Sequence, residues 1–178
     1  MKFRFDKPTC QNIRKSLRKE WIETNGLGDY ASSSLICCNT RKYHGLLVAD
    51  LESPAGRHVL LSSLEESLLV GGRELCFSCR KHPGVFYPRG NEHLEEMDAG
   101  EWPVFRYRFG EVTLTRELML IPGHRLLLVR YEVRGTAPDT PPVVLRVKPL
   151  LAFPMPMTSP ARIPRCVPKR FRPPPGSA

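Results

Sequence analysis

Short apolar runs separated by turn residues fill the chain from residue 45 to residue 153. Examples are GLLVADL at 45–51, GGRELCFSC at 71–79 and EVTLTRELMLI at 111–121. In the last of these, apolar residues and Arg116 alternate with other residues over 112–120, and a period of two places alternate side chains on one face of a strand. Runs that recur about every 8 to 12 residues predict an all-β fold, an antiparallel β-sandwich. Arg116 then needs a partner or a position at the rim.

Three segments between these runs have the composition of tight turns. They are GG at 71–72, FGE at 109–111 and PGH at 122–124. A glycine pair between two strand-like runs favours a two-residue hairpin, because both residues can adopt positive φ. The regular spacing of these turns supports antiparallel neighbours along the chain.

Helical composition is confined to CQNIRKSLRK at 10–19, where Ile13 and Leu17 would share one narrow face. The acidic segment 92–101 is expected to be a loop or a short helical turn. From Pro154 the chain has eight prolines in 25 residues, with five Lys and Arg and no acidic residue. This basic, Pro-rich tail lacks strand or helix periodicity, so it is predicted to be disordered or polyproline-like.

The charge pattern argues against a nucleic-acid partner. The formal net charge is +9, but a large share of it lies in the tail. Basic residues interleaved with aromatics on one face, or a recognisable binding module, would be needed for a nucleic-acid interface, and neither occurs. No apolar run approaches the roughly 18 residues that span a bilayer, and the N-terminal sequence has charges throughout. We therefore expect a cytoplasmic protein with no membrane partner.

The six cysteines are expected to be reduced thiols. Cys76 and Cys79 have C-x-x-C spacing, but a structural zinc site needs four ligands. The second pair would have to be Cys37 and Cys38, whose adjacency is wrong for a zinc knuckle. Cysteines in strands are the favoured interpretation, with zinc as the alternative, so we expect no metal and no cofactor.

Several segments together carry a family resemblance. They are EWIETNGLGDYASSSLICCNTRKYHGLLVA, GRHVLLSSLEE, HPGVFYPRGNEHL, WPVFRYRFGEVTLTRELMLIPG and LRVKPLLAF. Over residues 18–153 the chain resembles the N-terminal domain of the bacterial and archaeal type glycogen debranching enzymes. The resemblance implies a lead segment at 1–17, a β-sandwich at 18–153 that packs against a catalytic (α/α) barrel, and the tail at 154–178. In the full-length family the activity is that of an amylo-α-1,6-glucosidase and 4-α-glucanotransferase.

Cleavage of an α-1,6 glucosidic bond requires two carboxylates at a fixed separation. The resemblance places that pair in the barrel, which this chain lacks. Glu65 and Glu66 are neighbours on an expected strand and point to opposite faces, while Asp98 and Glu101 lie in an expected solvated loop. We therefore expect no catalytic residue here and an accessory domain that is inactive alone. Where the family continues toward its barrel, this chain enters the Pro-rich tail, as a truncated or frameshifted product would.

The stretch at 20–47 is the most distinctive of the chain. Gly26-Leu27-Gly28 resembles a phosphate-binding loop only weakly, because no helix follows it. The family context instead suggests residues that face the glucan or the barrel, since amides and an aromatic ring suit sugar hydroxyls and ring faces. These candidates are Asn25, Gly26, Asn39, Arg41, Tyr43 and His44. The alternative is that Tyr43 and His44 are satisfied at the edge of the sandwich.

Three functional hypotheses stay open. The first is an accessory domain for glycogen breakdown, with an α-glucan or a catalytic barrel as its partner. The second is a free-standing α-glucan-binding module, and the third is a protein interaction module acting through the Pro-rich tail. Without its barrel, the domain is expected to expose an apolar face near residues 39–44 and to self-associate.

Overall fold

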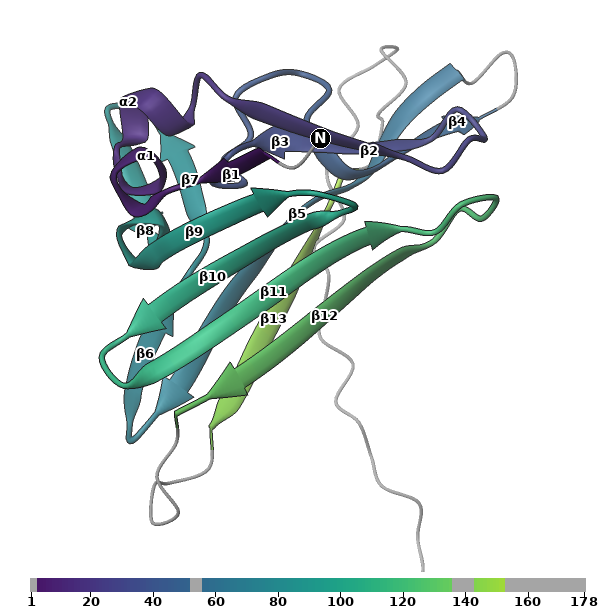
Figure 1. Ribbon diagram of the computed structural model, residues 1–178. Coiled ribbons are helices and arrows are strands. Elements are labelled where there is room, and N and C mark those ends of the chain that lie inside the picture. The colour runs from purple at the N-terminus through teal and green to yellow at the C-terminus, as the bar shows by residue number, and fades with distance from the viewer. Residues whose placement is uncertain (1–2, 52–55, 136–142, 153–178) are drawn as a thin grey trace, which may run out of the picture.

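Two antiparallel sheets lie face to face in the computed structural model, which describes residues 3–51, 56–135 and 143–152 (Figure 1). Sheet A has the strand order β1 (Phe3–Phe5), β9 (Leu94–Ala99), β10 (Pro103–Phe109), β11 (Val112–Leu120), β12 (Leu127–Arg134). Sheet B has the order β13 (Val144–Leu151), β5 (Gly56–Val70), β4 (Gly45–Leu51), β3 (Tyr30–Ser34), β2 (Glu20–Thr24), with β6 (Arg73–Cys76) also paired to β5. Strands β7 (Cys79–His82) and β8 (Val85–Arg89) form a separate hairpin. The predicted all-β antiparallel fold is confirmed, and the predicted tail at 154–178 lies outside the described residues.

Strand β11 shows the expected alternation most clearly. Its residues are buried at every second position, from Val112 through Leu114, Arg116 and Leu118 to Leu120. The buried row faces β5 across the sandwich, where Arg116 meets Glu66. Of the two positions that the sequence allowed for Arg116, the structure has the buried one with a partner.

Two of the predicted tight turns are two-residue hairpin loops. Val70 pairs with Arg73 across Gly71 and Gly72, whose φ angles are 53° and 77°. Positive φ at both positions matches the right-handed twist of the flanking strands, which is why glycine is favoured at each. The β10–β11 turn at 110–111 likewise has a glycine with positive φ.

The single helix expected at 10–19 is instead two short helices, α1 (Lys7–Gln11) and α2 (Ile13–Ser16). The break falls at Asn12, which has an extended backbone (φ −81°, ψ 102°) and whose side chain accepts a hydrogen bond from the N–H of Lys15. Asparagine competes in this way with the helical backbone and favours an N-cap over a helix interior. The lead segment packs on the sandwich, with Cys10 fully buried.

The acidic segment 92–101, expected as a loop or a short helical turn, is mostly strand. A single 3-10 turn, η1 (Gly90–His93), leads into β9, which pairs with β1 on one side and β10 on the other. Leu94 and Met97 anchor β9 in the core, since both are fully buried. Pairing on both edges has overridden the low strand propensity of the acidic residues. None of the helices in the described ranges is long and apolar enough to cross a bilayer.

Candidate functional site

The six candidate residues lie in two loops at opposite ends of strand β3, rather than in one loop. Asn25 and Gly26 belong to the β2–β3 turn, and the other four lie in the β3–β4 loop. Five residues of extended strand separate the two loops by about 15 Å. The two groups therefore have different surroundings.

Asn25 is buried and its side chain is fully engaged within the fold. Its amide nitrogen donates to Asp29 Oδ2 and to the carbonyl oxygen of His124, both at 2.9 Å. Its Oδ1 accepts a hydrogen bond from the N–H of Leu27, also at 2.9 Å. Gly26 stands at the tip of the turn with φ +79°. Asn25 thus shapes the turn and joins it to the β11–β12 loop.

Asp29 continues this connection to two further elements. Its Oδ1 accepts from the backbone N–H of Asp50 at 2.7 Å, and its Oδ2 accepts from Arg125 Nε at 3.0 Å. Arg125 Nη2 also donates to the carbonyl oxygen of Asp50 at 2.9 Å. Burial acts to raise the pKa of Asp29, but the hydrogen bonds it receives, led by that from Arg125, lower the pKa below its ordinary value. We call Asn25, Asp29, Asp50 and Arg125 the sheet latch, because they join sheet B to the β11–β12 loop of sheet A.

The second glycine of the GLG sequence is favoured by its backbone conformation. Gly28 has φ +91°, and a Cβ added there would also lie 2.9 Å from Asp50 Oδ2, so that the Asp50 side chain would have to move. Side chains other than that of glycine are strained at this φ. The two glycines are therefore explained by the local turn and its packing.

Asn39 anchors the β3–β4 loop to the neighbouring strands. Its Nδ2 donates to the carbonyl oxygen of Ser62 on β5 at 2.8 Å, and its Oδ1 accepts from Ser33 Oγ at 2.7 Å. Each contact crosses to a different strand of sheet B. The loop thereby has a fixed position relative to the sheet.

His44 is nearly buried at the end of the same loop. Its Nδ1 accepts a hydrogen bond from the N–H of Thr40 at 3.2 Å, which leaves the proton of the neutral ring on Nε2. Nε2 lies 3.6 Å from Glu20 Oε1. Burial lowers the pKa of His44, with Glu20 opposing that shift and Arg41 adding to it. A neutral, buried imidazole of this kind holds the loop in shape.

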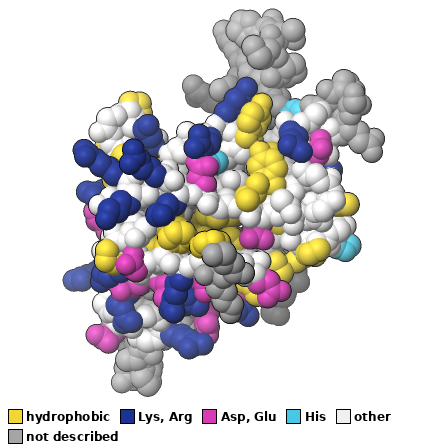
Figure 2. Space-filling model, turned by 45° about the horizontal axis from the view of Figure 1, so that its top comes forward, with side chains coloured by type: hydrophobic (Ala, Val, Ile, Leu, Met, Phe, Trp, Pro, Cys, Tyr) yellow, Lys and Arg dark blue, Asp and Glu magenta, His cyan; other side chains and the backbone are white. Residues whose placement is uncertain are grey.

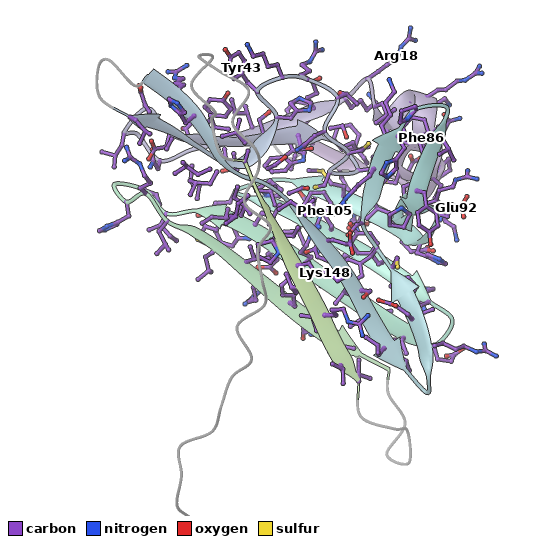
Figure 3. All side chains as sticks on the ribbon, turned by 180° about the vertical axis from the view of Figure 1, so that it is seen from behind. Arg18, Tyr43, Phe86, Glu92, Phe105 and Lys148 are labelled. Carbon is purple, nitrogen blue, oxygen red and sulfur yellow. The ribbon has the colours of Figure 1, made fainter. Side chains whose placement is uncertain are left out.

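Tyr43 and Arg41 point outward from the loop. The Tyr43 side chain is 52% exposed, and Lys42 Nζ lies 5.3 Å from its ring centroid. Tyr30 on β3 donates its hydroxyl proton to the carbonyl oxygen of Tyr43 at 3.2 Å, which fixes the backbone beneath the ring. Arg41 Nε pairs with Glu20 Oε1 at 2.5 Å. Figure 3 shows Tyr43 at the outer surface, well away from Phe105 in the core.

The face of the molecule drawn in Figure 2 carries both apolar and charged side chains. In Figure 2, hydrophobic side chains gather in patches between clusters of Lys and Arg, with a few acidic groups among them. An exposed aromatic ring beside polar, charged groups is suited to stacking on a sugar ring while hydroxyls are hydrogen-bonded.

A buried polar network lies between the sheets, and the sequence indicated only one of its members, Arg116. Arg116 Nη1 donates to Glu66 Oε2, and the Tyr131 hydroxyl donates to Glu66 Oε1. Arg116 Nη2 donates to Cys37 Sγ at 3.0 Å, and its guanidinium lies 4.4 Å from the ring centroid of Phe105. Burial acts to lower the pKa of Arg116, but the Glu66 carboxylate raises it well above its ordinary value. An arginine on the apolar face of β11 was the signal; its partner could not be identified from sequence alone.

Glu65 and Glu66 point to opposite faces of β5, as predicted. Glu66 is 1% exposed and lies in the buried network, whereas Glu65 pairs on the outer face with Arg80 and Lys148. The two carboxylates therefore cannot flank one glycosidic bond. Asp98, expected in a loop, instead lies on β9 opposite Arg4.

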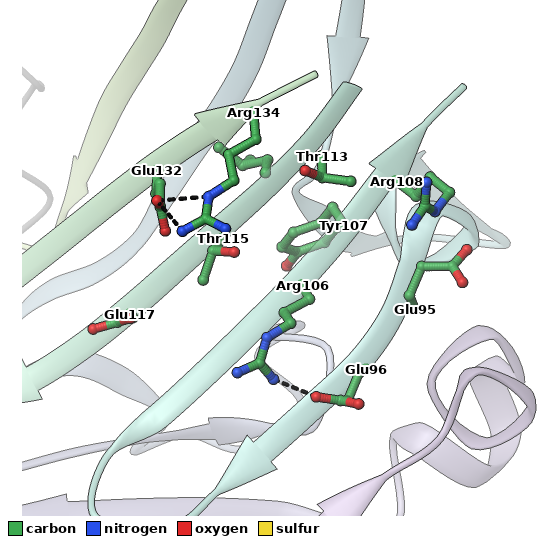
Figure 4. A pocket seen from close by; sticks show the side chains of 11 residues that line it. Glu95, Glu96, Arg106, Tyr107, Arg108, Thr113, Thr115, Glu117, Glu132 and Arg134 are labelled. Atoms are coloured by element: carbon green, nitrogen blue, oxygen red, sulfur yellow. Dashed lines mark hydrogen bonds and ion pairs between the residues drawn. The ribbon is translucent and has the colours of Figure 1, made fainter. Parts of the chain in front are cut away.

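A surface depression with a volume of about 590 Å³ lies elsewhere, on the outer face of sheet A (Figure 4). Arginine and glutamate side chains alternate with threonines across it, and ion pairs such as Arg106 with Glu96 and Arg134 with Glu132 neutralise one another. None of the six candidate residues lines it. This combination is typical of a solvated strand face.

The C-x-x-C cysteines are divided between two strands. Cys76 ends β6 and is half-buried, and Cys79 begins β7 and is buried. Over the described ranges, no group of three or more His, Cys, Asp or Glu side chains is placed to hold a metal ion.

Comparison with known protein families gives one result. A family model described as "Glycogen debranching enzyme N terminal" matches residues 19–155. The matched range contains all six candidate residues and every strand except β1. Comparisons with curated proteins and with solved structures gave no match.

Proposed function

Because this chain belongs to the family of glycogen debranching enzyme N-terminal domains, as its motifs predicted, we propose that it is a cytoplasmic accessory domain for α-glucan breakdown. In this proposal the sandwich presents the Tyr43 face to a glucan chain or to the catalytic barrel of a debranching enzyme. Bond cleavage requires two convergent carboxylates and takes place in that barrel.

The exposed Tyr43 ring on a fixed loop is the observation that carries the proposal. Asn39 and His44 hold the loop, and the Tyr30 hydroxyl fixes the backbone of Tyr43. A ring presented in this way stacks on a glucose unit with little loss of conformational entropy. Arg41 stands beside it with donors for sugar hydroxyls. Asn25 and Gly26 take part indirectly, by shaping the turn at the other end of β3.

Glycogen co-sedimentation of the 178-residue chain tests the proposal. We expect Tyr43→Ser to weaken binding about three- to tenfold, the range for loss of one aromatic contact. Leu27→Ser is the matched control, because Leu27 is also about half exposed but lies at the far end of β3. Equal binding by both variants and the unaltered chain would exclude Tyr43 from the glucan surface.

Co-sedimentation with glycogen and a binding measurement with an isolated family barrel together separate the alternatives. Glycogen binding by the chain alone supports a free-standing module. Binding only to the barrel, weakened by Tyr43→Ser, supports the barrel-facing role. A variant that ends at residue 153 should behave like the full chain in either case. If removal of the tail abolishes binding, the third hypothesis is favoured, a module that acts through residues 154–178.

The lack of catalysis is tested independently with a branched limit dextrin. We expect no glucose release, because Glu65 and Glu66 face opposite sides and Glu66 is held by Arg116 and Tyr131. Turnover that persists through purification and disappears in a Glu65→Gln variant would contradict an accessory role.

A further inference from the structure

A second surface groove lies on the outer face of sheet B, beneath the β7–β8 hairpin. Its volume is about 360 Å³, within the range of small-molecule sites, and β5, β6, β7, β8 and β13 all contribute to its lining. Figure 3 looks onto this side of the molecule and shows Lys148 on β13, far from Tyr43. The groove is therefore separate from the Tyr43 face.

Glu65 forms one fixed acceptor in the groove. Lys148 Nζ lies 2.7 Å from its Oε1, and Arg80 Nη2 lies 2.9 Å from its Oε2. The hydrogen bond from Lys148 is the main reason that the pKa of Glu65 lies below its ordinary value. At neutral pH this side chain is an ionised acceptor whose orientation is set by two cations.

Glu74 forms a second fixed acceptor on the neighbouring strand β6. Ser67 Oγ donates to its Oε1 at 2.7 Å, and Arg146 Nη1 donates to the same oxygen at 2.9 Å. The hydrogen bond from Ser67 contributes most to lowering the pKa of Glu74. No described residue donates to its Oε2, which can accept from a ligand, since an ionised carboxylate has about four acceptor positions.

The charged groups in the groove are already paired with one another, which restricts the ligand. Glu65 pairs with Arg80 and Lys148, and Glu74 pairs with Arg146 at the edge of the groove, so that three basic groups surround two carboxylates. An anion would meet the two carboxylates, and a cation would meet the basic groups. A neutral ligand rich in hydroxyl groups can instead donate to the carboxylates and accept from the cations.

Tyr87 supplies an aromatic wall at the rim. It is 70% exposed, the highest exposure among the large hydrophobic side chains of the described residues. His82 Nε2 lies 3.1 Å from the carbonyl oxygen of Tyr87, so the backbone that carries the ring is tied across the hairpin. A solvent-facing ring beside fixed hydroxyl-binding groups has the chemistry that a pyranose ring requires.

We propose that this groove is a binding site for a neutral oligosaccharide, with one sugar ring stacked on Tyr87 and its hydroxyl groups bonded to Glu65 and Glu74. The class of ligand follows from the lining of the groove. Its identity as an α-glucan rests on the proposed function. The groove would give the domain a second point of contact with a glucan, on a different face from Tyr43.

Isothermal titration of the 178-residue chain with maltoheptaose tests this site. We expect Tyr87→Ser to weaken binding about three- to tenfold, and Glu74→Gln to weaken it as well. Val85→Ser is the matched control, because Val85 is an exposed apolar residue on the same hairpin that does not line the groove. Its affinity should equal that of the unaltered chain. Melting temperatures of all variants verify that each is folded.

The outcomes distinguish this proposal from the proposed function. Binding that depends on Tyr43 and not on Tyr87 would overturn the groove and support the Tyr43 face. Binding of a neutral oligosaccharide other than an α-glucan, dependent on Tyr87, would support the groove and contradict the role in glucan breakdown. The groove would not be a site for neutral sugars if no neutral oligosaccharide binds. The same conclusion would follow if dextran sulfate were the only saccharide whose binding depends on Tyr87.

Discussion

Single polar side chains of the distinctive 20–47 stretch act mainly by holding loops in place. The buried side chain of Asn25 makes three hydrogen bonds. Removing its amide would take these hydrogen bonds away from the carbonyl oxygen of His124 and from the N–H of Leu27. Each unsatisfied buried group costs about 1–3 kcal/mol, so we expect Asn25→Ala to lower the free energy of unfolding by roughly 2–4 kcal/mol. Urea denaturation measures the difference. Leu27→Ala, in the same turn but exposed, should change it by less than about 0.5 kcal/mol.

His44 gives the stability a dependence on pH whose sign follows from its burial. The pKa of His44 in the folded protein is lowered from the ordinary value of 6.5, so the unfolded chain binds the proton first as the pH falls. The stabilisation due to neutral His44 is complete above about pH 7 and is lost as the pH falls through 6.5 toward the folded pKa. Glu20 opposes the shift and limits its size, while Arg41 reinforces it.

The corresponding experiment compares the unaltered chain with His44→Gln, which keeps a polar side chain but does not titrate. Between pH 7.5 and 5.5, the unaltered chain should lose more unfolding free energy than the variant, by at most about 1.4 kcal/mol for each pH unit. Parallel curves would show that His44 titrates alike in both states. A gain in stability of the unaltered chain on acidification would show that the pKa is raised.

At the scale of elements, the Glu66–Arg116 pair connects β5 of sheet B with β11 of sheet A, and both side chains are buried between the sheets. Removing one charge leaves the other buried without compensation, which typically costs 3–5 kcal/mol. We therefore expect Glu66→Gln to destabilise the fold by about that amount. The double variant Glu66→Leu with Arg116→Met should be more stable than the single one, because no charge is then left buried without a partner, and only the Tyr131 hydroxyl loses its acceptor. Guanidinium denaturation gives all three values; a double variant as unstable as the single one would show that the pair itself, not the stranded charge, sets the stability.

Strands and turns that neighbouring residues determine could be predicted from the sequence, whereas strands that depend on pairing with distant segments could not. The alternation of 112–120 and the glycine pair at 71–72 are set by neighbouring residues, and both predictions were confirmed. Strands β3 and β9 were missed, because serines and acidic residues rarely form strands and here do so through pairing on both sides. In β3 the hydroxyls of Ser32 and Ser34 donate to the backbone oxygens of Trp21 and Cys38, and that of Ser33 donates to Asn39 Oδ1.

The candidate site shows the same limit. Outward exposure of Tyr43 could be expected from its place among polar residues. The internal use of Asn25 and Asn39 could not, since their amides bond to His124 and Ser62, 99 and 23 residues away. Residue type indicated hydrogen-bonding capacity, and only the fold decides which groups are already satisfied.

For the whole molecule, the arrangement of the two sheets leaves apolar side chains near two free edges. Strand β12 ends sheet A and β13 ends sheet B, with no further described strand beyond either. Val147 is in register with the buried Glu66 and so faces the interior, yet it is 38% exposed. Leu151, at the end of the same strand, and Leu128 on β12 are more exposed still. Edge strands with apolar side chains and unpaired backbone groups are templates for association.

The chain should therefore self-associate at moderate concentration, as the sequence suggested, but through two separate surfaces. The exposed Tyr43 face is one, and the β12–β13 edges are the other. Because the edge adds backbone hydrogen bonding to apolar contact, we expect Val147→Lys to shift the molecule toward the monomer more strongly than Tyr43→Ser does. Light scattering over a wide concentration range measures the shift, with Val85→Ser as a control for the loss of an exposed apolar side chain. If the unaltered chain is a monomer at every concentration, neither surface mediates association. If only Tyr43→Ser reduces the association, the Tyr43 surface, which is the glucan- or barrel-facing side, mediates it alone.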